Sequence, residues 1–451
     1  MRSLNGKELK ELADEVIRAS QGSDTEVIII SEKTDHARFS RSQIHQYTNL
    51  EKTELFVRIR FGKKAAVGRT TNITKEGILE AVRNTEKIAL SIEEDPYLPN
   101  SEEPWNNPLE EKIDKNIIAF SQEEKAHMIN DLKKAFPEQE LFGSLITGLT
   151  SIVVANSRGL SISYSFTDLH LTINIVDGDE SYWEQISTNT LDDLNLDEII
   201  SSLEAKLLLD VKYMDISPGR YTVILSPLAL EEIVSFLGYA GFSARAEEEG
   251  ISFLKGKVDE KVFSEKLTII DDPLREEGLP MPFDLEGVKK GKTTLVEKGV
   301  FRTFAYDKKT ALKKNTKSTG HCVGIFQSFP YTAHLEILPG SSKLKDIIKR
   351  TEEGIYVSRF HYVNLLDPRA FTLTGMTRDG TYLIKHGKIV GMLPNLRFTQ
   401  NFVEAFNNIE DISRETRKLG AVHSYESRLP MEAILPYIKI KDFNFTGISR
   451  E

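Results

Sequence analysis

The sequence predicts an α+β fold in two domains, each with a mainly antiparallel sheet and packed helices. Strand-type and helix-type segments come in blocks, not in strict alternation, which disfavours a doubly wound parallel sheet. Tight turn motifs such as Lys298-Gly299 and His386-Gly387 separate strand segments, as antiparallel hairpins require. At 451 residues, the chain is also longer than one ordinary core supports.

The first domain is predicted to span residues 1–215. Thr74 is placed as a helix N-cap, and Ser121 and Glu124 have the spacing of a capping box. Residues 93–111 hold four prolines among acids and asparagines, which predicts an extended surface segment. Helices are predicted over residues 9–17, 74–92, 121–136 and 190–211, and strands over residues 26–31, 43–48, 54–60, 144–155 and 160–176.

The second domain is predicted to span residues 216–451, with the boundary near the turn residues 217–220. A strand over 221–225 leads into a helix over 228–238, and Pro227 suits the first helical position because its missing N–H would have no partner there. Further strands are predicted over residues 266–270, 293–297, 300–304, 334–338, 354–360, 371–376 and 381–384.

Composition excludes several classes of protein. A formal net charge of −10 argues against a nucleic-acid binder, which normally has a basic surface. A single cysteine, Cys322, allows no disulfide within the chain and suits a reducing compartment. The chain start lacks the apolar segment of a signal peptide, and the apolar runs are too short to span a membrane. We therefore expect a cytoplasmic location.

Ten short motifs follow one another in a set order along the chain. They occupy residues 37–40, 43–46, 153–159, 271–273, 282–287, 295–300, 317–321, 367–369, 374–380 and 395–398. Each motif is weak alone, but their ordered succession resembles the TldD/PmbA family, whose members were once described as modulators of DNA gyrase. The resemblance runs from about residue 37 to about residue 447.

The resemblance implies a fold, an activity and a partner. Members of the family are two-domain α+β proteins that form dimers, often of two different members. The TldD type carries zinc and cleaves unfolded or modified peptides, whereas the TldE/PmbA type is its partner and lacks the zinc site. In the TldD type, a His-Glu-x-x-x-His helix follows the first strand of the second domain, and a cysteine near the C-terminus completes the ligand set.

The corresponding helix of this chain carries Glu231 and Glu232 but no histidine. No histidine occurs between Leu171 and Gly320, so no shift in alignment restores the motif, and residues 424–446 contain no cysteine. Zinc in such a peptidase activates a water and polarises the amide carbonyl, which requires these ligands. We therefore expect no metal, no cofactor and no catalytic residue on this chain, and zinc only on a TldD-like partner.

Three hypotheses follow. The first is a non-zinc subunit of a cytosolic TldD/PmbA-type metallopeptidase, which shapes the substrate chamber for unfolded or modified peptides. The alternative is a stand-alone homodimeric peptide-binding protein without hydrolase activity. The third is a hydrolase with unconventional ligands such as His321 and Cys322, but adjacent residues rarely bind one ion together. No nucleic acid or membrane is expected as a partner.

Two motifs supply the candidate substrate-binding residues. They are Ser318, Thr319, Gly320, His321, Thr374, Gly375, Arg378 and Asp379. A serine nucleophile with a neighbouring histidine base is disfavoured, since adjacent side chains seldom reach that geometry, and a glycine loop that contacts substrate is preferred. For the Arg378-Asp379 pair, the default interpretation is a salt bridge that locks an Asp-Gly hairpin turn.

Two further interpretations concern the peptide cleft. Glu231 and Glu232 are either polar groups of the cleft or, by preference, a solvated first helical turn where acids favour the helix dipole. Residues 371–384 are either an open sheet edge to which an unfolded peptide adds as a strand, or an interior strand with both neighbours filled. These two interpretations of residues 371–384 are equally weighted.

Overall fold

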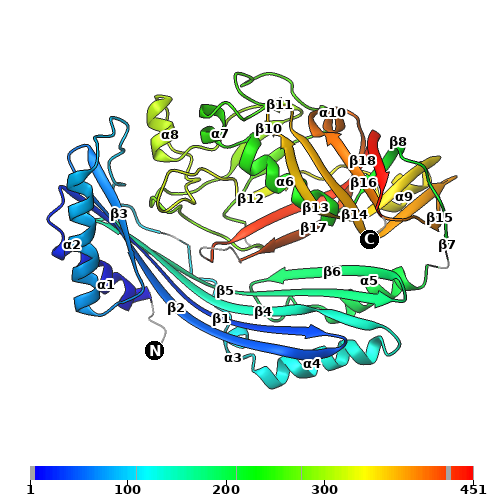
Figure 1. The fold of residues 1–451 in the computed structure, drawn as a ribbon, viewed down its shortest axis with the longest axis horizontal. Coiled ribbons are helices and arrows are strands. Elements are labelled where there is room, and N and C mark those ends of the chain that lie inside the picture. The colour runs from blue at the N-terminus through cyan, green and yellow to red at the C-terminus, as the bar shows by residue number, and fades with distance from the viewer. Residues whose placement is uncertain (1–5, 108, 210, 276, 423–427, 450–451) are drawn as a thin grey trace.

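The protein is described from a computed structural model, which covers residues 6–107, 109–209, 211–275, 277–422 and 428–449. Two sheets organise it: a long curved sheet from the first part of the chain and a strongly coiled sheet from the second part, which lies above it in Figure 1. The predicted α+β class with mainly antiparallel sheets is confirmed.

The first sheet has six strands in the order β3-β2-β1-β4-β5-β6, and all neighbours are antiparallel. Its strands are β1 (Asp24–Ser40), β2 (Gln43–Phe61), β3 (Lys64–Thr70), β4 (Glu140–Asn156), β5 (Ser161–Asp177) and β6 (Glu180–Thr188). Two strands predicted separately over 43–48 and 54–60 are one strand, β2, because β1 pairs with it along its whole length. The hairpin predicted between β4 and β5 is confirmed.

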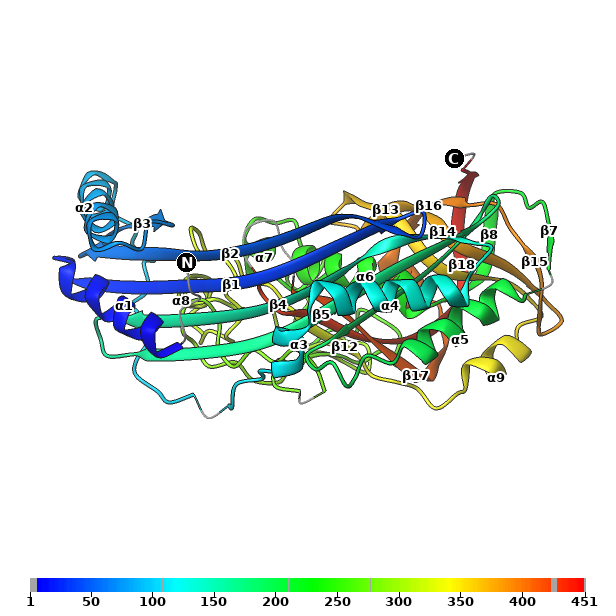
Figure 2. The ribbon, with the colours of Figure 1, turned by 90° about the horizontal axis from the view of Figure 1, so that it is seen from below.

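The helices that cover this sheet are α1 (Gly6–Ala19), α2 (Lys75–Ser91), α3 (Lys115–Ala119), α4 (Gln122–Ala135) and α5 (Leu196–Leu207). Figure 2 shows α1 and α2 at one end of the sheet and α3 and α4 towards the other. Both predicted caps are confirmed: Thr74 accepts the Gly77 N–H, and Ser121 and Glu124 form a capping box. The predicted helix over 190–211 begins later, where Asn195 caps it.

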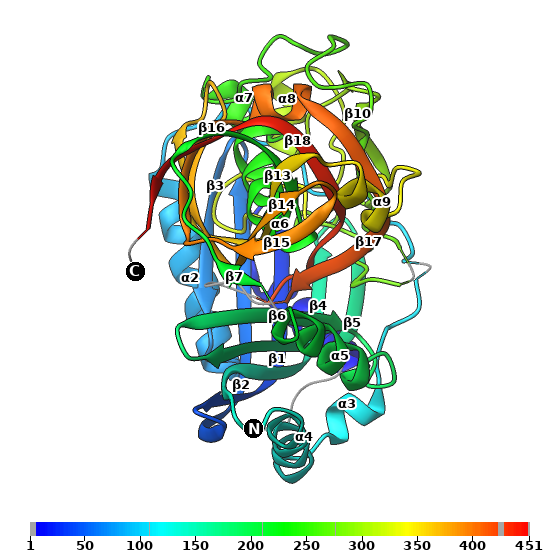
Figure 3. The same ribbon diagram turned by 90° about the vertical axis from the view of Figure 1, so that its right-hand side faces the viewer.

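The second sheet has twelve strands. They are β7 (Lys212–Tyr213), β8 (Gly219–Leu225), β9 (Ile269–Asp271), β10 (Thr293–Glu297), β11 (Val300–Phe301), β12 (His334–Ile337), β13 (Glu353–Asp367), β14 (Thr372–Lys385), β15 (Lys388–Met392), β16 (Leu396–Asn401), β17 (Ile409–Ala421) and β18 (Met431–Ile448). Strand β18 pairs with β8, β8 with β13, β13 with β14, β14 with β16, and β16 with β18 again. These pairings close a ring of strands, which Figure 3 views from one end.

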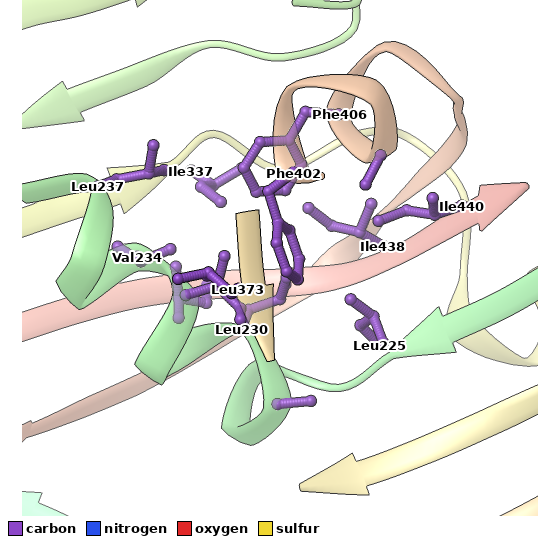
Figure 4. Packing of buried hydrophobic residues seen from close by; sticks show 14 of the residues in the cluster. Leu225, Leu230, Val234, Leu237, Ile337, Leu373, Phe402, Phe406, Ile438 and Ile440 are labelled. Carbon is purple, nitrogen blue, oxygen red and sulfur yellow. The ribbon is translucent and has the colours of Figure 1, made fainter. Parts of the chain in front are cut away.

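The helices of the second part are α6 (Pro227–Phe236), the π-helix η1 (Leu237–Gly241), α7 (Ala244–Glu248), α8 (Lys308–Lys313), α9 (Leu344–Lys349) and α10 (Phe402–Asn407). Leu230, Val234 and Leu237 pack with Phe402 and Ile438 in the largest core, as Figure 4 shows. Helix α6 is thereby fixed against the strands.

The segment over residues 371–384 corrects two interpretations. It is one continuous strand, β14, in which Asp379 and Gly380 have φ of 56° and 116° and lie opposite an irregular stretch of β13, so no Asp-Gly hairpin forms there. Thr372 pairs with Asp367 on one side and Asn401 on the other. The proposed open edge for peptide addition is therefore wrong, and the interior-strand alternative holds.

The two sheets meet along a surface that we call the seam. Ser181 of β6 donates to Asp379 of β14 at 2.6 Å, and Arg428 forms an ion pair with Asp168 of β5. The short strand β7 pairs with β15 of the second sheet although the predicted boundary assigns it to the first domain. Across the described ranges, no helix is long and apolar enough to cross a membrane.

Candidate functional site

Helix α6 begins directly after strand β8. Ser226 accepts the N–H of Ala229 as N-cap, and Pro227 occupies the first helical position as predicted. The helix is largely apolar because it is packed into the core, yet Glu231 and Glu232 interrupt the apolar sequence. It continues into the π-helix η1, a rare element that is found frequently at functional sites.

A pocket with a volume of about 270 Å³ opens beside this helix, and we call it the α6 pocket. Helix α6, the segment before β12, β12 itself, the end of β17 and the start of β18 form its walls. Its lining residues are Glu231, Glu232, Val234, Ser235, Tyr331, Thr332, Ala333, Leu335, Gly420, Met431, Glu432 and Ala433. The pocket thus combines an apolar surface with three carboxyl groups.

The carboxyl groups of the α6 pocket are poorly solvated. Burial raises the pKa of Glu231 to about 7, with the Gln185 amide donating to it at 3.0 Å. Burial also raises the pKa of Glu232, which accepts the Val363 N–H at 3.3 Å. Burial likewise raises the pKa of Glu432. The expected solvated first turn at Glu231 and Glu232 is therefore wrong, since both line the pocket.

Aromatic rings extend from the pocket to the surface. Tyr331 stacks with Phe329 at 6.3 Å between ring centroids, and Phe329 lies 5.9 Å from the exposed Tyr239 of η1. The hydroxyl of Tyr331 is 3.3 Å from Ser235 Oγ. An apolar rim with hydrogen-bonding groups behind it suits an extended peptide, which offers both side chains and amides.

These groups do not fit a zinc site. The pocket offers carboxyl oxygens but neither an imidazole nor a thiolate, and adjacent helix residues such as Glu231 and Glu232 point in different directions. Each already accepts a hydrogen bond from Gln185 or Val363. Within the ranges that the structure describes, no group of three or more His, Cys, Asp or Glu could hold a metal ion.

The predicted loop around residue 320 is only partly buried: Gly320 and His321 are buried, whereas Ser318 and Thr319 are partly exposed and Ser318 lines a surface pocket. Ser318 Oγ donates to the Tyr306 carbonyl at 3.1 Å, and His321 Nδ1 lies 2.8 Å from Thr319 Oγ1. The His321 side chain is buried, with its Nε2 3.6 Å from Asp271. Ser318 and His321 therefore do not form a nucleophile and base.

The backbone explains why a glycine occupies position 320 of this loop. Gly320 has φ of 73°, and a methyl group there would lie 3.0 Å from the Lys289 carbonyl oxygen. The Cys322 thiol donates to the Gly324 carbonyl, and His334 Nε2 lies 3.0 Å from the Leu279 carbonyl oxygen. The structure thus gives Cys322 and His334 separate partners, and a substrate role for residues 318–321 stays a prediction.

The other candidate substrate-binding residues, Thr374, Gly375, Arg378 and Asp379, lie on β14. Thr374 Oγ1 donates to the Phe398 carbonyl at 2.8 Å, and a methyl group at Gly375 would lie 2.9 Å from the Phe398 ring, so both serve the pairing with β16. Asp379 is buried and lies 3.2 Å from Arg359, not in a salt bridge with the exposed Arg378. A substrate-binding role for these four candidate residues stays a prediction.

Sequence reasoning missed Gln185, Tyr331 and Glu432. They come from β6, from the segment before β12, and from β18, and only the fold brings them to α6. No local motif marks them.

Comparison with known proteins places the chain in a family. The family model of the PmbA/TldA metallopeptidase C-terminal domain matches residues 218–447. The chain belongs to the TldD/PmbA family. The matched region includes β8, α6 and the whole α6 pocket. The motif resemblance in the sequence is thereby confirmed.

Relatives and solved structures agree with this assignment. The chain is 29% identical over 256 residues to an uncharacterized protein of Methanocaldococcus jannaschii, covering 56% of this chain and 59% of that one. It is 27% identical over 253 residues to a metalloprotease TldD homolog of Buchnera aphidicola, covering 53% of this chain and 51% of the relative. The fold is similar to the crystal structure of TldE from Thermococcus kodakarensis, with a TM-score of 0.84, 20% identity, and coverage of 97% and 100%. The chain thus spans only about half the length of these curated relatives.

The raised pKa of Glu231 predicts a pH-dependent effect of Glu231→Gln. Because the folded-state pKa of about 7 lies above the ordinary 4.5, the carboxyl favours the folded state fully at low pH, and that stability is lost as pH rises through 7. We expect Glu231→Gln to raise the free energy of unfolding by about 1–2 kcal/mol at pH 8, and to change it little at pH 5.

Denaturant unfolding of parent and variant at both pH values measures this difference. Glu94→Gln, at an exposed glutamate of the segment after α2, is the matched control for the loss of one charge. An equal effect of Glu231→Gln at pH 5 and pH 8 contradicts the assignment of a raised pKa.

Proposed function

We propose that this chain is the non-zinc subunit of a TldD/PmbA-type cytosolic metallopeptidase system, and that its α6 pocket forms part of the chamber for unfolded or modified peptides. One observation carries the proposal. The helix that follows the first strand of the second domain bears Glu231 and Glu232 in place of histidines, and it opens on a pocket rather than on a metal-binding group. Zinc and the hydrolytic water then come from a TldD-like partner.

The chemistry of the α6 pocket supports peptide binding without hydrolysis. A carboxyl group with a pKa of about 7 can either accept a hydrogen bond from a backbone N–H or donate one to a backbone carbonyl near neutral pH. The aromatic residues Tyr331 and Phe329 supply contact area for side chains of varied sequence. With a volume of about 270 Å³, the pocket admits only a short part of a chain, so a folded protein is excluded.

The proposal requires a second chain, because one chain does not enclose a chamber. Affinity capture from the native cell is expected to recover a paralogue that carries the His-Glu-x-x-x-His motif. Light scattering on the purified chain at micromolar concentration is expected to show a dimer. A monomer in light scattering, together with capture of no motif-bearing paralogue, contradicts the proposal.

A further inference from the structure

A second pocket, with a volume of about 300 Å³, lies on the seam at the N-terminal end of α6, and we call it the seam pocket. Residues of β6 and α5 from the first part of the chain line it together with residues of β13, β14, β15, β17, β18 and α9. Only the first turn of α6 reaches it, whereas the α6 pocket is lined by the middle of that helix. The two pockets share no lining residue.

Two buried hydroxyl groups in its wall have no hydrogen-bond partner within the described part of the chain. They are Ser358 Oγ and the Tyr382 hydroxyl, and their residues are only 5% and 2% exposed. Burial raises the pKa of Tyr382, so its hydroxyl keeps its proton and can donate. A buried polar group without a partner is costly, and native proteins normally give it one.

Gly380 lies beside both hydroxyls, and a side chain there would clash with them. A methyl group on Gly380 would lie 2.6 Å from Ser358 Oγ and 3.0 Å from the Tyr382 hydroxyl. Its φ of 116° also disfavours any larger residue. Both hydroxyls therefore converge on one small space, which belongs to the strand irregularity at Asp379 and Gly380.

The charges around the seam pocket favour an anion. Among the described lining residues, Glu184 is the only carboxylate, while Lys206 and Arg417 are cations. Burial alone would raise the pKa of Glu184, but the charges of Lys206 and Arg417 hold it at about 2, so the three charged lining groups together carry one positive charge. Pro227 and Leu228 place the positive end of the α6 dipole at the same pocket.

One side of the remaining wall is apolar. Leu228, Leu344, Ile348 and Ile389 line it on the side of α6, α9 and β15. A single surplus positive charge suits a monoanion better than a phosphate dianion, and the aliphatic wall suits a ligand with an apolar body.

We propose that the seam pocket binds a small monocarboxylate with an apolar body, of about the size of an N-acyl amino acid. The carboxylate accepts hydrogen bonds from the Ser358 and Tyr382 hydroxyls and lies near Arg417, while the apolar body contacts Leu228 and Ile389. The ligand contacts both parts of the chain and so stabilises the seam. The inference does not depend on the proposed peptidase role, because it concerns the chain alone.

Calorimetric titration of the purified full chain with N-acetyl-L-leucine tests the proposal, with N-acetyl-L-leucinamide as the uncharged probe. We expect saturable binding of the carboxylate and a rise of the melting temperature in its presence, with the amide binding at least about tenfold more weakly. Absence of saturable binding up to about 10 mM carboxylate, or equal binding of the amide, overturns the proposal.

Removing the hydroxyls locates the site. The double variant Ser358→Ala, Tyr382→Phe is expected to fold, because it deletes two unpartnered groups, and to bind the carboxylate at least about tenfold more weakly. Tyr164→Phe is the matched control, since Tyr164 also has a buried hydroxyl without a partner among the described residues but lies in a core cluster that shares no residue with the seam pocket. Binding by the double variant at the strength of the parent and of Tyr164→Phe overturns the assignment.

Discussion

Replacing Arg428 by alanine is expected to destabilise the protein by about 3–5 kcal/mol, because it leaves the Asp168 carboxylate buried without its cation. The two side chains are only 5% and 3% exposed, and Arg428 Nε also donates to Thr150 Oγ1 at 3.1 Å. Arg428 precedes β18 of the second sheet and Asp168 belongs to β5 of the first, so this pair joins the two sheets. Denaturant unfolding measures the loss.

A double-mutant cycle separates the interaction energy of the Arg428–Asp168 pair from the effects of the other contacts that each side chain makes. If the pair is the cause, Asp168→Ala combined with Arg428→Ala destabilises by clearly less than the two single variants together. Arg350→Ala, which removes a more exposed ion pair with Asp411, is the control and is expected to have a much smaller effect. Additive effects of the two buried changes would mean that packing rather than charge pairing holds the seam.

The helix caps could be predicted from the sequence because they depend on local chemistry. Ser121 and Glu124 satisfy backbone N–H groups within one turn, and Thr74 does the same for α2. The position of Pro227 is equally local. These features require no knowledge of the distant chain.

Most of β14 was predicted as two strands, but its continuity through Asp379 and Gly380 could not be predicted, because distant strands impose the conformation there. Asp379-Gly380 is a typical turn sequence, and both residues have positive φ, but β13 pairs across the irregularity and Arg359 and Ser181 hold Asp379. Tertiary contacts therefore override a local turn signal. Gly380 of this irregularity also lies beside the Ser358 and Tyr382 hydroxyls.

The candidate site was only partly visible in the sequence. The missing histidines of α6 could be recognised from the motif order, but local rules placed Glu231 and Glu232 in solvent. Their burial depends on Tyr331 and on residues of β17 and β18, which surround α6 only in the folded chain. The elevated pKa of Glu231 is a consequence of that tertiary environment.

The largest expected effect is on hydrolysis in a mixed complex. In the proposed complex, the zinc that activates water for attack on an amide is held by the partner, because the described lining of the α6 pocket offers neither an imidazole nor a thiolate. Adding a TldD-like paralogue with the His-Glu-x-x-x-His motif is expected to raise the rate of peptide hydrolysis by at least about a thousandfold over this chain alone.

A variant of this chain tests whether its pocket takes part in the reaction. Ser235 is an exposed residue of the α6 pocket, so Ser235→Trp is expected to cover the pocket without disturbing the core, and to lower kcat/KM of the mixed complex by about tenfold or more. Ser91→Trp, at the end of α2 in the first domain, introduces the same side chain away from the pocket. Equal activity of these two complexes argues against a chamber role for the α6 pocket.

The most direct test is the initial rate of hydrolysis of an unfolded peptide by this chain, by the zinc-bearing paralogue, and by their mixture, with zinc counted in each sample. We predict no hydrolysis and no stoichiometric zinc for this chain alone, and chelator-sensitive hydrolysis for the mixture. Because contaminating protease is the usual confounder, the mixture is repeated with an inactive point mutant of the paralogue. About one tightly held zinc per chain in this protein alone, or hydrolysis by it that survives chelator and repeated purification, would contradict the account.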